Sequence, residues 1–213
     1  MFQNRMDAGL KLADNLQQFK DKNVVVLAIP RGGLPLGAIV AQSLHAPLDV
    51  ALSKKIGHPY NKEYAIGAVS LDDIILSDLP HIDKTYISRE TEIIRQKLRK
   101  RFDQYYRNSS PLDLMGKSVI IVDDGVATGN TIKITAQIVH KKRPEKVIVA
   151  IPVAPTRAVE NMKSSNYIDE VICLETPYNF HAVGQFYQEF REVSDDEAIQ
   201  LLEQTRRLFA SKK

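Results

Sequence analysis

The sequence predicts an α/β fold with a mostly parallel central sheet covered by helices. Five apolar runs alternate with segments in which apolar residues recur every three or four positions, a pattern typical of strands joined by helical crossovers. The runs are almost continuously apolar, as expected for strands that are buried on both faces. The predicted strands span residues 24–29, 48–56, 118–123, 146–153 and 168–174, and the helices between them span 34–45, 131–142 and 155–164.

Size and charge exclude several classes of protein. The chain has 213 residues and a formal net charge of +3, from 29 basic and 26 acidic residues. This length suits one well-buried domain with an appendage, and the charge is too small to predict a nucleic-acid partner. No stretch reaches the roughly 18 consecutive apolar residues of a membrane helix, so we expect a cytoplasmic protein without a membrane partner. The single cysteine, Cys173, lies in an apolar run and is expected to be a small buried residue.

Three segments depart from the simple alternation. Residues 4–20 have an amphipathic helical pattern that we expect to pack on the sheet edge. An insertion at about residues 57–107 includes a candidate flexible loop and a long helix from about residue 88 to 106, whose apolar stripe suits the core or a dimer interface. Residues 175–213 form an aromatic segment followed by a helix that opens with a capping box. We therefore expect a core at 1–174 and an appendage at 175–213.

The segment at residues 119–131 carries the strongest indication of function. An apolar strand stops at Asp123 and Asp124, and a turn of small residues leads into a helical pattern that begins at Thr131. Two adjacent carboxylates are costly to bury without a ligand or partners, although an Asx-type turn is the structural alternative. A helix start offers unpaired N–H groups and a partial positive charge, which suit a phosphate. The candidate phosphate-binding residues are Gly125, Val126, Ala127, Thr128, Gly129, Asn130 and Thr131.

A second glycine turn lies between the first predicted strand and the first predicted helix. It contains Arg31, Gly32 and Gly33, and the topology of a parallel sheet places it at the same edge as the acidic pair. The glycines allow the backbone to approach an anion closely, and arginine supplies a planar group of donors. The spacing is not G-x-G-x-x-G, and no Walker-type lysine follows Gly129. An anion site and a purely structural turn both remain open.

Two lysines end the second predicted strand. Lys54 and Lys55 could reach an anion held by the glycine turn, or they could form an exposed basic turn. Asn61, Glu63 and Tyr64 follow in the predicted loop.

The order of these motifs resembles that of type I phosphoribosyltransferases. Most of the chain is similar to a bacterial group of stand-alone members that are named mainly from their motifs. The resemblance implies a Rossmann-like phosphoribosyltransferase fold in which residues 175–213 form a small C-terminal hood. It rests on Pro-Arg-Gly-Gly at 30–33, the strand end at 54–56, Ala-Ile-Gly-Ala-Val at 65–69, the segment at 119–131, and Phe-x-Ala-Val-Gly at 180–184.

The resemblance also implies a donor, phosphoribosyl pyrophosphate, and a role for each motif. Asp123 and Asp124 would accept hydrogen bonds from the ribose hydroxyls, and residues 125–131 would bind the 5-phosphate. Mg²⁺ would be held mainly through pyrophosphate and ribose, with no direct protein ligand. A non-proline cis peptide is expected at the Arg31–Gly32 bond or the bond before it. The pyrophosphate-binding residues would be Arg31, Gly32, Gly33, Lys54 and Lys55, and the catalytic residues Asp123, Asp124, Arg31 and Lys55.

The implied activity is transfer of a 5-phosphoribosyl group to an unidentified acceptor, expected to be a nitrogenous base, with release of pyrophosphate. Such an enzyme of nucleotide metabolism would act on small molecules as a homodimer. Tyr178 and Phe180 are candidates to stack on the acceptor, or they simply pack in an irregular segment; His181 is expected to be structural or exposed rather than a general base. The alternative is a non-catalytic sensor of phosphoribosyl pyrophosphate or a nucleotide that acts through a partner.

Overall fold

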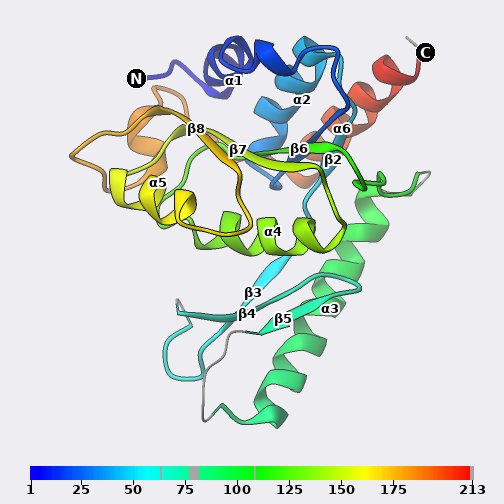
Figure 1. Cartoon of the computed structure of the whole chain (residues 1–213), viewed down its shortest axis with the longest axis vertical. Helices are drawn as coiled ribbons and strands as arrows, with labels where there is room; N and C mark the ends of the chain where they lie inside the picture. The colour runs from blue at the N-terminus through cyan, green and yellow to red at the C-terminus, as the bar shows by residue number, and fades with distance from the viewer. Residues whose placement is uncertain (63, 77–81, 108, 212–213) are drawn as a thin grey trace.

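The centre of the molecule is a five-stranded, all-parallel sheet with the strand order β2-β1-β6-β7-β8 (Figure 1). The computed structural model describes residues 1–62, 64–76, 82–107 and 109–211. β1 and β6 lie side by side, and Ala28 pairs with Val122 where the two strands end. The prediction of an α/β fold with a parallel sheet is therefore confirmed. The strands are β1 (Val24–Ala28), β2 (Leu48–Val50), β6 (Ser118–Val122), β7 (Lys146–Val153) and β8 (Glu170–Glu175).

Helices cover both faces of this sheet, α1, α2 and α6 on one side and α4 and α5 on the other (Figure 1). Successive strand residues point to opposite faces. In β1, Val24 and Val26 join the core under the first group of helices, whereas Val25 and Leu27 join the core under the second. Within the described ranges, no helix has the length and apolarity to cross a membrane. The helices are α1 (Arg5–Asp14), α2 (Gly33–Leu44), α4 (Asn130–Lys141), α5 (Thr156–Lys163) and α6 (Asp195–Ala210).

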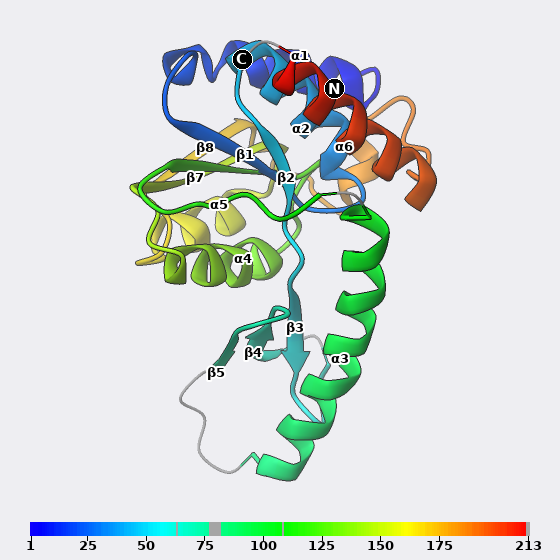
Figure 2. The ribbon, with the colours of Figure 1, turned by 90° about the vertical axis from the view of Figure 1, so that its right-hand side faces the viewer.

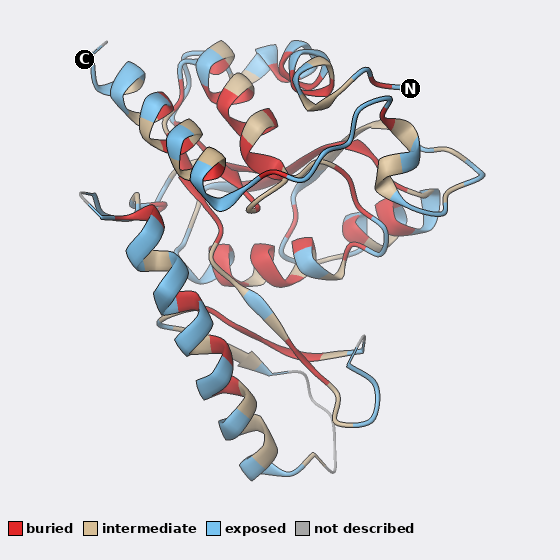
Figure 3. Ribbon diagram, turned by 180° about the vertical axis from the view of Figure 1, so that it is seen from behind, coloured by how far each residue is buried: buried red, intermediate tan, exposed pale blue. Residues whose placement is uncertain are grey.

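The insertion forms a second, antiparallel sheet with the order β3-β4-β5, and α3 (Lys84–Tyr105) runs beside it (Figure 2). Ile94 and Leu98 of α3 pack in a small core with this sheet, while the outer face of α3 is exposed (Figure 3). The candidate flexible loop falls partly on Glu63 and residues 77–81, which lie outside the described residues. The strands are β3 (Lys54–Gly57), β4 (Ala65–Val69) and β5 (Ile74–Leu76).

The prediction of one strand over residues 48–56 is wrong. β2 ends at Val50, and the last bond to β1 is donated by the Ala51 N–H to the Ala28 carbonyl, at 2.9 Å. The chain then leaves the parallel sheet and resumes as β3 in the antiparallel sheet. Ala51 is buried in one core and Leu52 packs against two others, so the apolar pattern continues across the break and conceals it.

The N-terminal prediction also needs correction. The helix expected over 4–20 ends at Asp14, and a short 3₁₀ turn, η1 (Gln17–Phe19), follows it. α1 packs mainly on α2 rather than on the sheet edge. A Cβ at Gly9 would lie 2.9 Å from Ile39 Cδ1, so the helices meet through a small-residue face of α1. Met6 and Leu10, expected in the apolar stripe, are instead 64% and 58% exposed.

The C-terminal segment crosses back over the sheet before it forms α6. A second 3₁₀ turn, η2 (Val183–Phe186), precedes Tyr187, which bridges to Phe2 of the N-terminal segment. The predicted start of the last helix is confirmed, because Ser194 Oγ accepts a bond from the Glu197 N–H at 3.1 Å. α6 packs against α2, β2 and α3. Both termini of the described chain thus pack on the same side of the parallel sheet (Figure 1).

Candidate active site

Two loops meet at the carboxyl ends of β1 and β6. The N–H of Ile29, just after β1, donates to the carbonyl of Val122 at 2.9 Å. A Cβ at Gly32 would lie 2.1 Å from Asp124 Oδ2, and one at Gly33 would lie 2.5 Å from the Val122 carbonyl oxygen. Only glycine leaves room for this contact, so the sequence motif Gly32-Gly33 is explained by the close approach of the acidic loop.

The peptide bond between Pro30 and Arg31 is cis. This bond is the second of the two positions at which the sequence predicts a non-proline cis peptide, and the prediction is confirmed there.

The two carboxylates of the acidic loop lie in a largely buried environment. The Asp124 N–H donates to Asp123 Oδ1 at 2.9 Å. Burial, with the neighbouring charge of Asp124, raises the pKa of Asp123 well above its ordinary value. Burial also raises the pKa of Asp124, although hydrogen bonding and charge from Arg5 oppose the shift. Hydrogen-bond donors or a cation bound here would therefore stabilise the ionised form of the two carboxylates.

Arg5, at the start of α1, is the direct partner of the Asp124 carboxylate. Its Nε and Nη2 atoms lie 2.8 Å and 2.7 Å from Asp124 Oδ2. Tyr187 adds a third contact, because its hydroxyl donates to the Asp124 carbonyl at 2.6 Å. Sequence reasoning missed both residues, since neither lies in a recognisable motif and each is brought to the acidic loop by chain folding.

The turn after the acidic pair leads directly into α4. Gly125 has φ +153° and Gly129 has φ +80°, conformations that other residues adopt at a cost. Gly129 is the N-cap of α4 and supplies no side chain to the helix start. Thr128 and Thr131 are exposed. The loop therefore presents hydroxyls and the positive end of a helix dipole, which are suited to an anion.

A cavity of about 230 Å³ lies beside the glycine turn and gathers basic side chains. Pro30, Thr131 and the two predicted lysines, Lys54 and Lys55, line it. Arg101 of α3 lines it too. The sequence predicts a helix over about residues 88–106, which includes Arg101, but the packing of α3 that brings this side chain to the cavity cannot be read from a local pattern. Residues from the lysine pair, the start of α4 and α3 therefore line the same cavity.

Arg31 is turned toward the C-terminal segment. Its guanidinium hydrogen-bonds Glu192 and lies 3.8 Å from Asp195 Oδ1 at the start of α6. The Arg31 side chain is 31% exposed, while Glu192 is 77% exposed. Any anion that binds Arg31 therefore competes with an exposed carboxylate rather than with a buried one.

The two predicted acceptor residues have different surroundings. Tyr178 is fully exposed, and the ring of Phe180 stacks on Phe186 with centroids 5.3 Å apart. His181 is exposed, as expected. The segment instead approaches the acidic loop through Val183, whose Cγ1 would lie 2.5 Å from a Cβ at Gly125. Cys173 is half-buried, and burial raises the pKa of its thiol to about 11.

The fold and this sheet edge define an α/β protein whose chemically distinctive residues follow the carboxyl ends of β1 and β6. Residues 4–191 match the family model described as phosphoribosyl transferase domain. The chain therefore belongs to the phosphoribosyl transferase domain family.

The chain is also similar to several proteins of known sequence or structure. "Putative phosphoribosyl transferase Rv0571c" from Mycobacterium tuberculosis H37Rv is 40% identical over 215 residues, which cover 99% of this chain and 48% of the relative. The chain thus spans about half the length of the curated relatives it matches. The structure of TT1426 from Thermus thermophilus is 38% identical, with a TM-score of 0.89 over 95% of this chain and 98% of that one. A protein from Neisseria gonorrhoeae, solved with bound ppGpp, shares the fold at 16% identity and a TM-score of 0.51, covering 97% and 99% of the two chains.

Proposed function

We propose that this chain is a phosphoribosyltransferase that uses phosphoribosyl pyrophosphate and Mg²⁺ and releases pyrophosphate. The observation that carries the proposal is the contact between the acidic loop and the glycine turn, where Asp124 lies against Gly32. A ligand that binds both loops should offer hydrogen-bond donors to the carboxylates and, close by, an anionic group to the glycine turn. Phosphoribosyl pyrophosphate has this arrangement, because its pyrophosphate is attached to the carbon next to the one that bears the 2-hydroxyl.

The acidic loop and the start of α4 would hold the ribose phosphate. Carboxylates accept hydrogen bonds only, so Asp123 and Asp124 suit the 2- and 3-hydroxyls. Residues 125–131 offer donors to the 5-phosphate, with Thr128 and Thr131 exposed at the helix start.

The glycine turn and the basic cavity would hold the pyrophosphate. Gly32 and Gly33 let the backbone approach the anion, and Lys54 and Lys55 line the adjacent cavity. Arg31 would leave Glu192 to join them. These groups neutralise a polyanion whose negative charge increases as it departs.

The reaction would break the bond between C1 of the ribose and the pyrophosphate oxygen, with the bonding electrons leaving on pyrophosphate. A bond from C1 to a ring nitrogen would form with inversion, and the proton of that nitrogen would pass to solvent. Asp124 would stabilise the positive charge that develops on the sugar, while Arg31 and Lys55 would stabilise the leaving group. Mg²⁺ would supply further charge neutralisation through oxygens of the substrate. The described residues contain no group of three or more His, Cys, Asp or Glu suited to a metal.

The remaining assignments complete the proposal. Residues 1–174 would form the donor-binding core, and residues 175–213 a hood over the acceptor, with Tyr178 and Phe180 contributing aromatic surface. The working form would be a homodimer in the cytoplasm.

The test is pyrophosphate release from phosphoribosyl pyrophosphate and Mg²⁺ with a panel of purine and pyrimidine bases. We expect release with at least one base by the wild type and none by the Asp123→Asn/Asp124→Asn double variant, which should also lose detectable binding of the donor. Donor binding without turnover on any acceptor would favour the sensor instead. Wild-type donor affinity in the double variant would refute the ribose-binding role.

A further inference from the structure

The ion pair between Arg5 and Asp124 joins residues 119 positions apart. The two side chains are only 11% and 14% exposed, and both short contacts from Arg5 end on the same oxygen, Oδ2. A charge pair this far removed from water is costly unless its geometry and remaining hydrogen bonds are good. Arg5 Nη1 also donates to the Arg191 carbonyl at 2.6 Å, and this hydrogen bond offsets part of that cost.

Arg5 also contacts the hood through an aromatic ring. Its guanidinium carbon lies 3.9 Å from the centroid of Phe190, close enough for a favourable cation–π contact. Phe190 in turn lies beside Tyr187, with centroids 4.9 Å apart, and the Tyr187 hydroxyl reaches the Asp124 carbonyl. One arginine therefore connects the acidic loop with the segment that follows η2.

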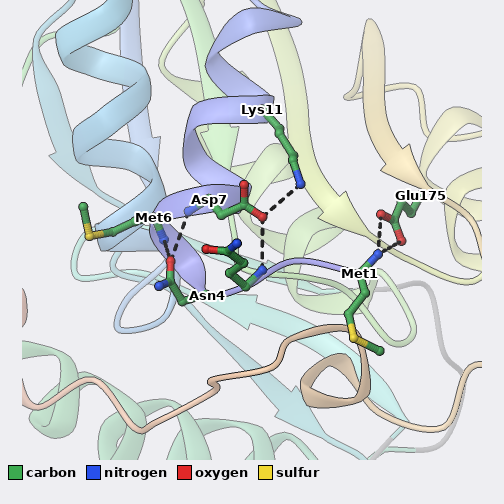
Figure 4. Close-up of polar contacts among 7 residues, drawn as sticks. Met1, Asn4, Met6, Asp7, Lys11 and Glu175 are labelled. Atoms are coloured by element: carbon green, nitrogen blue, oxygen red, sulfur yellow. Dashed lines mark hydrogen bonds and ion pairs between the residues drawn. The ribbon is translucent and has the colours of Figure 1, made fainter.

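The backbone that carries Arg5 is anchored on both sides. Asn4 caps α1 by accepting bonds from the N–H groups of Met6 and Asp7, and Asp7 accepts further bonds from Gln3 and Lys11 (Figure 4). Upstream, the Phe2 N–H donates to the Phe186 carbonyl at 2.8 Å. The start of α1 is thus held independently of the Arg5 side chain.

Helix chemistry alone does not favour arginine at this position. A cation in the first turn is unfavourable, because it lies near the positive end of the helix dipole, and this carries a cost in stability. The contact with Asp124 offsets this cost, so the residue type is explained by the acidic loop rather than by α1.

We propose that Arg5 is a positioning residue that holds the Asp124 carboxylate in the orientation that receives the ribose hydroxyls. Through Phe190 and Arg191 it also fixes the hood relative to that carboxylate. The inference rests on the proposed function, because it assigns Asp124 to ribose. It makes the N-terminal helix part of the donor site, although Arg5 itself touches no substrate atom.

Comparing the binding of two ligands distinguishes this role of Arg5 from a general effect of its positive charge. Phosphoribosyl pyrophosphate with Mg²⁺ carries the ribose, whereas pyrophosphate with Mg²⁺ lacks it. We expect Arg5→Gln to weaken binding of the first by at least about tenfold in calorimetric titration, and to leave binding of the second within about twofold. Arg5→Lys should recover part of the loss, since it keeps the charge but not the planar set of donors.

The matched control is Lys11→Gln, which removes the same charge from the same helix. Lys11 pairs with Asp7 and is 51% exposed, and this variant should bind both ligands as the wild type does. A melting curve checks that each variant is folded; if Arg5→Gln is not, Arg5→Lys alone must show the selective loss.

Equal loss of both ligands, or no loss of the donor, would overturn the role of Arg5. If the wild type bound pyrophosphate but not phosphoribosyl pyrophosphate, the proposed function would fail and this role with it. If the wild type bound both ligands and the Arg5 variants lost them equally, only the positioning role of Arg5 would be refuted.

Discussion

The carboxylate of Asp124 lies directly against Gly32, so that a Cβ at Gly32 would be only 2.1 Å from Oδ2 and 2.6 Å from Cγ. The two residues belong to separate loops, 92 positions apart in the sequence, at the ends of the adjacent strands β1 and β6. This contact makes the acidic loop and the glycine turn one structural unit. The site therefore depends on the packing of β1 against β6 as much as on the motifs themselves.

Gly32→Ala should damage the site. The added methyl group would displace Asp124, and we expect a loss of about 1–3 kcal/mol in the free energy of unfolding, as for other overpacked positions, together with loss of donor binding. Gly116→Ala is the control, because Gly116 has φ +64° but no atom within 4 Å of the place that its methyl group would occupy. It should lose some stability and no donor affinity, as measured by denaturant titration and calorimetry. Normal donor binding by Gly32→Ala would show that the contact is dispensable.

Asp123→Asn should stabilise the protein at neutral pH. The pKa of Asp123 is raised on folding, so its favourable contribution is complete below the unfolded pKa of about 4 and is lost as pH rises through the folded pKa. Asparagine keeps the bond from the Asp124 N–H without the charge. We expect a gain that is largest near pH 7 and shrinks toward pH 4, measured by urea unfolding across this range. Asp103→Asn on the exposed face of α3 is the control. An equal gain in stability in that variant would show that the effect does not come from the burial of Asp123.

Glu192→Gln should increase the affinity for pyrophosphate with Mg²⁺. The substitution removes the carboxylate that holds Arg31, so the guanidinium becomes available to the anion. Because Glu192 is highly exposed, the pair is worth only about 0.2–1 kcal/mol, and the gain should be no more than about fivefold. Glu203→Gln removes a carboxylate of α6 that pairs with Arg207, and it should bind like the wild type. Unchanged affinity in Glu192→Gln would mean that Arg31 does not reach the pyrophosphate.

Arg101→Ala should weaken pyrophosphate binding, because Arg101 lines the basic cavity with Lys54 and Lys55. A charged contact of this kind supports a loss of about tenfold in affinity, which should diminish at high salt. Arg99→Ala is a close control: it is the same change two positions earlier on α3, at an exposed residue that does not line the cavity. If both variants lost affinity equally, the effect would belong to the overall charge of the helix.

Much of the fold could be predicted because its signals are local. The apolar runs of the parallel strands specify burial on both faces, and Ser194 with Glu197 marks the start of α6 within one helical turn. The errors arose where local patterns do not distinguish alternatives. Ala51 and Leu52 are apolar whether the chain remains in one sheet or crosses to another, and the stripe containing Met6 and Leu10 does not reveal that α1 meets α2 through Gly9.

The chemistry available at the sheet edge can be read from the residues alone: two adjacent carboxylates, a glycine turn with an arginine, a lysine pair, and a loop that leads into a helix. Which of these groups meet, and which partners they have, became known from the folded chain. Asp124 forms an ion pair with Arg5, and Arg31 forms one with Glu192. Arg101 lines the same cavity as Lys54 and Lys55. The reason is physical: a residue's type and spacing set what it can bind, but contacts between residues far apart in the sequence form only when strands and helices pack together.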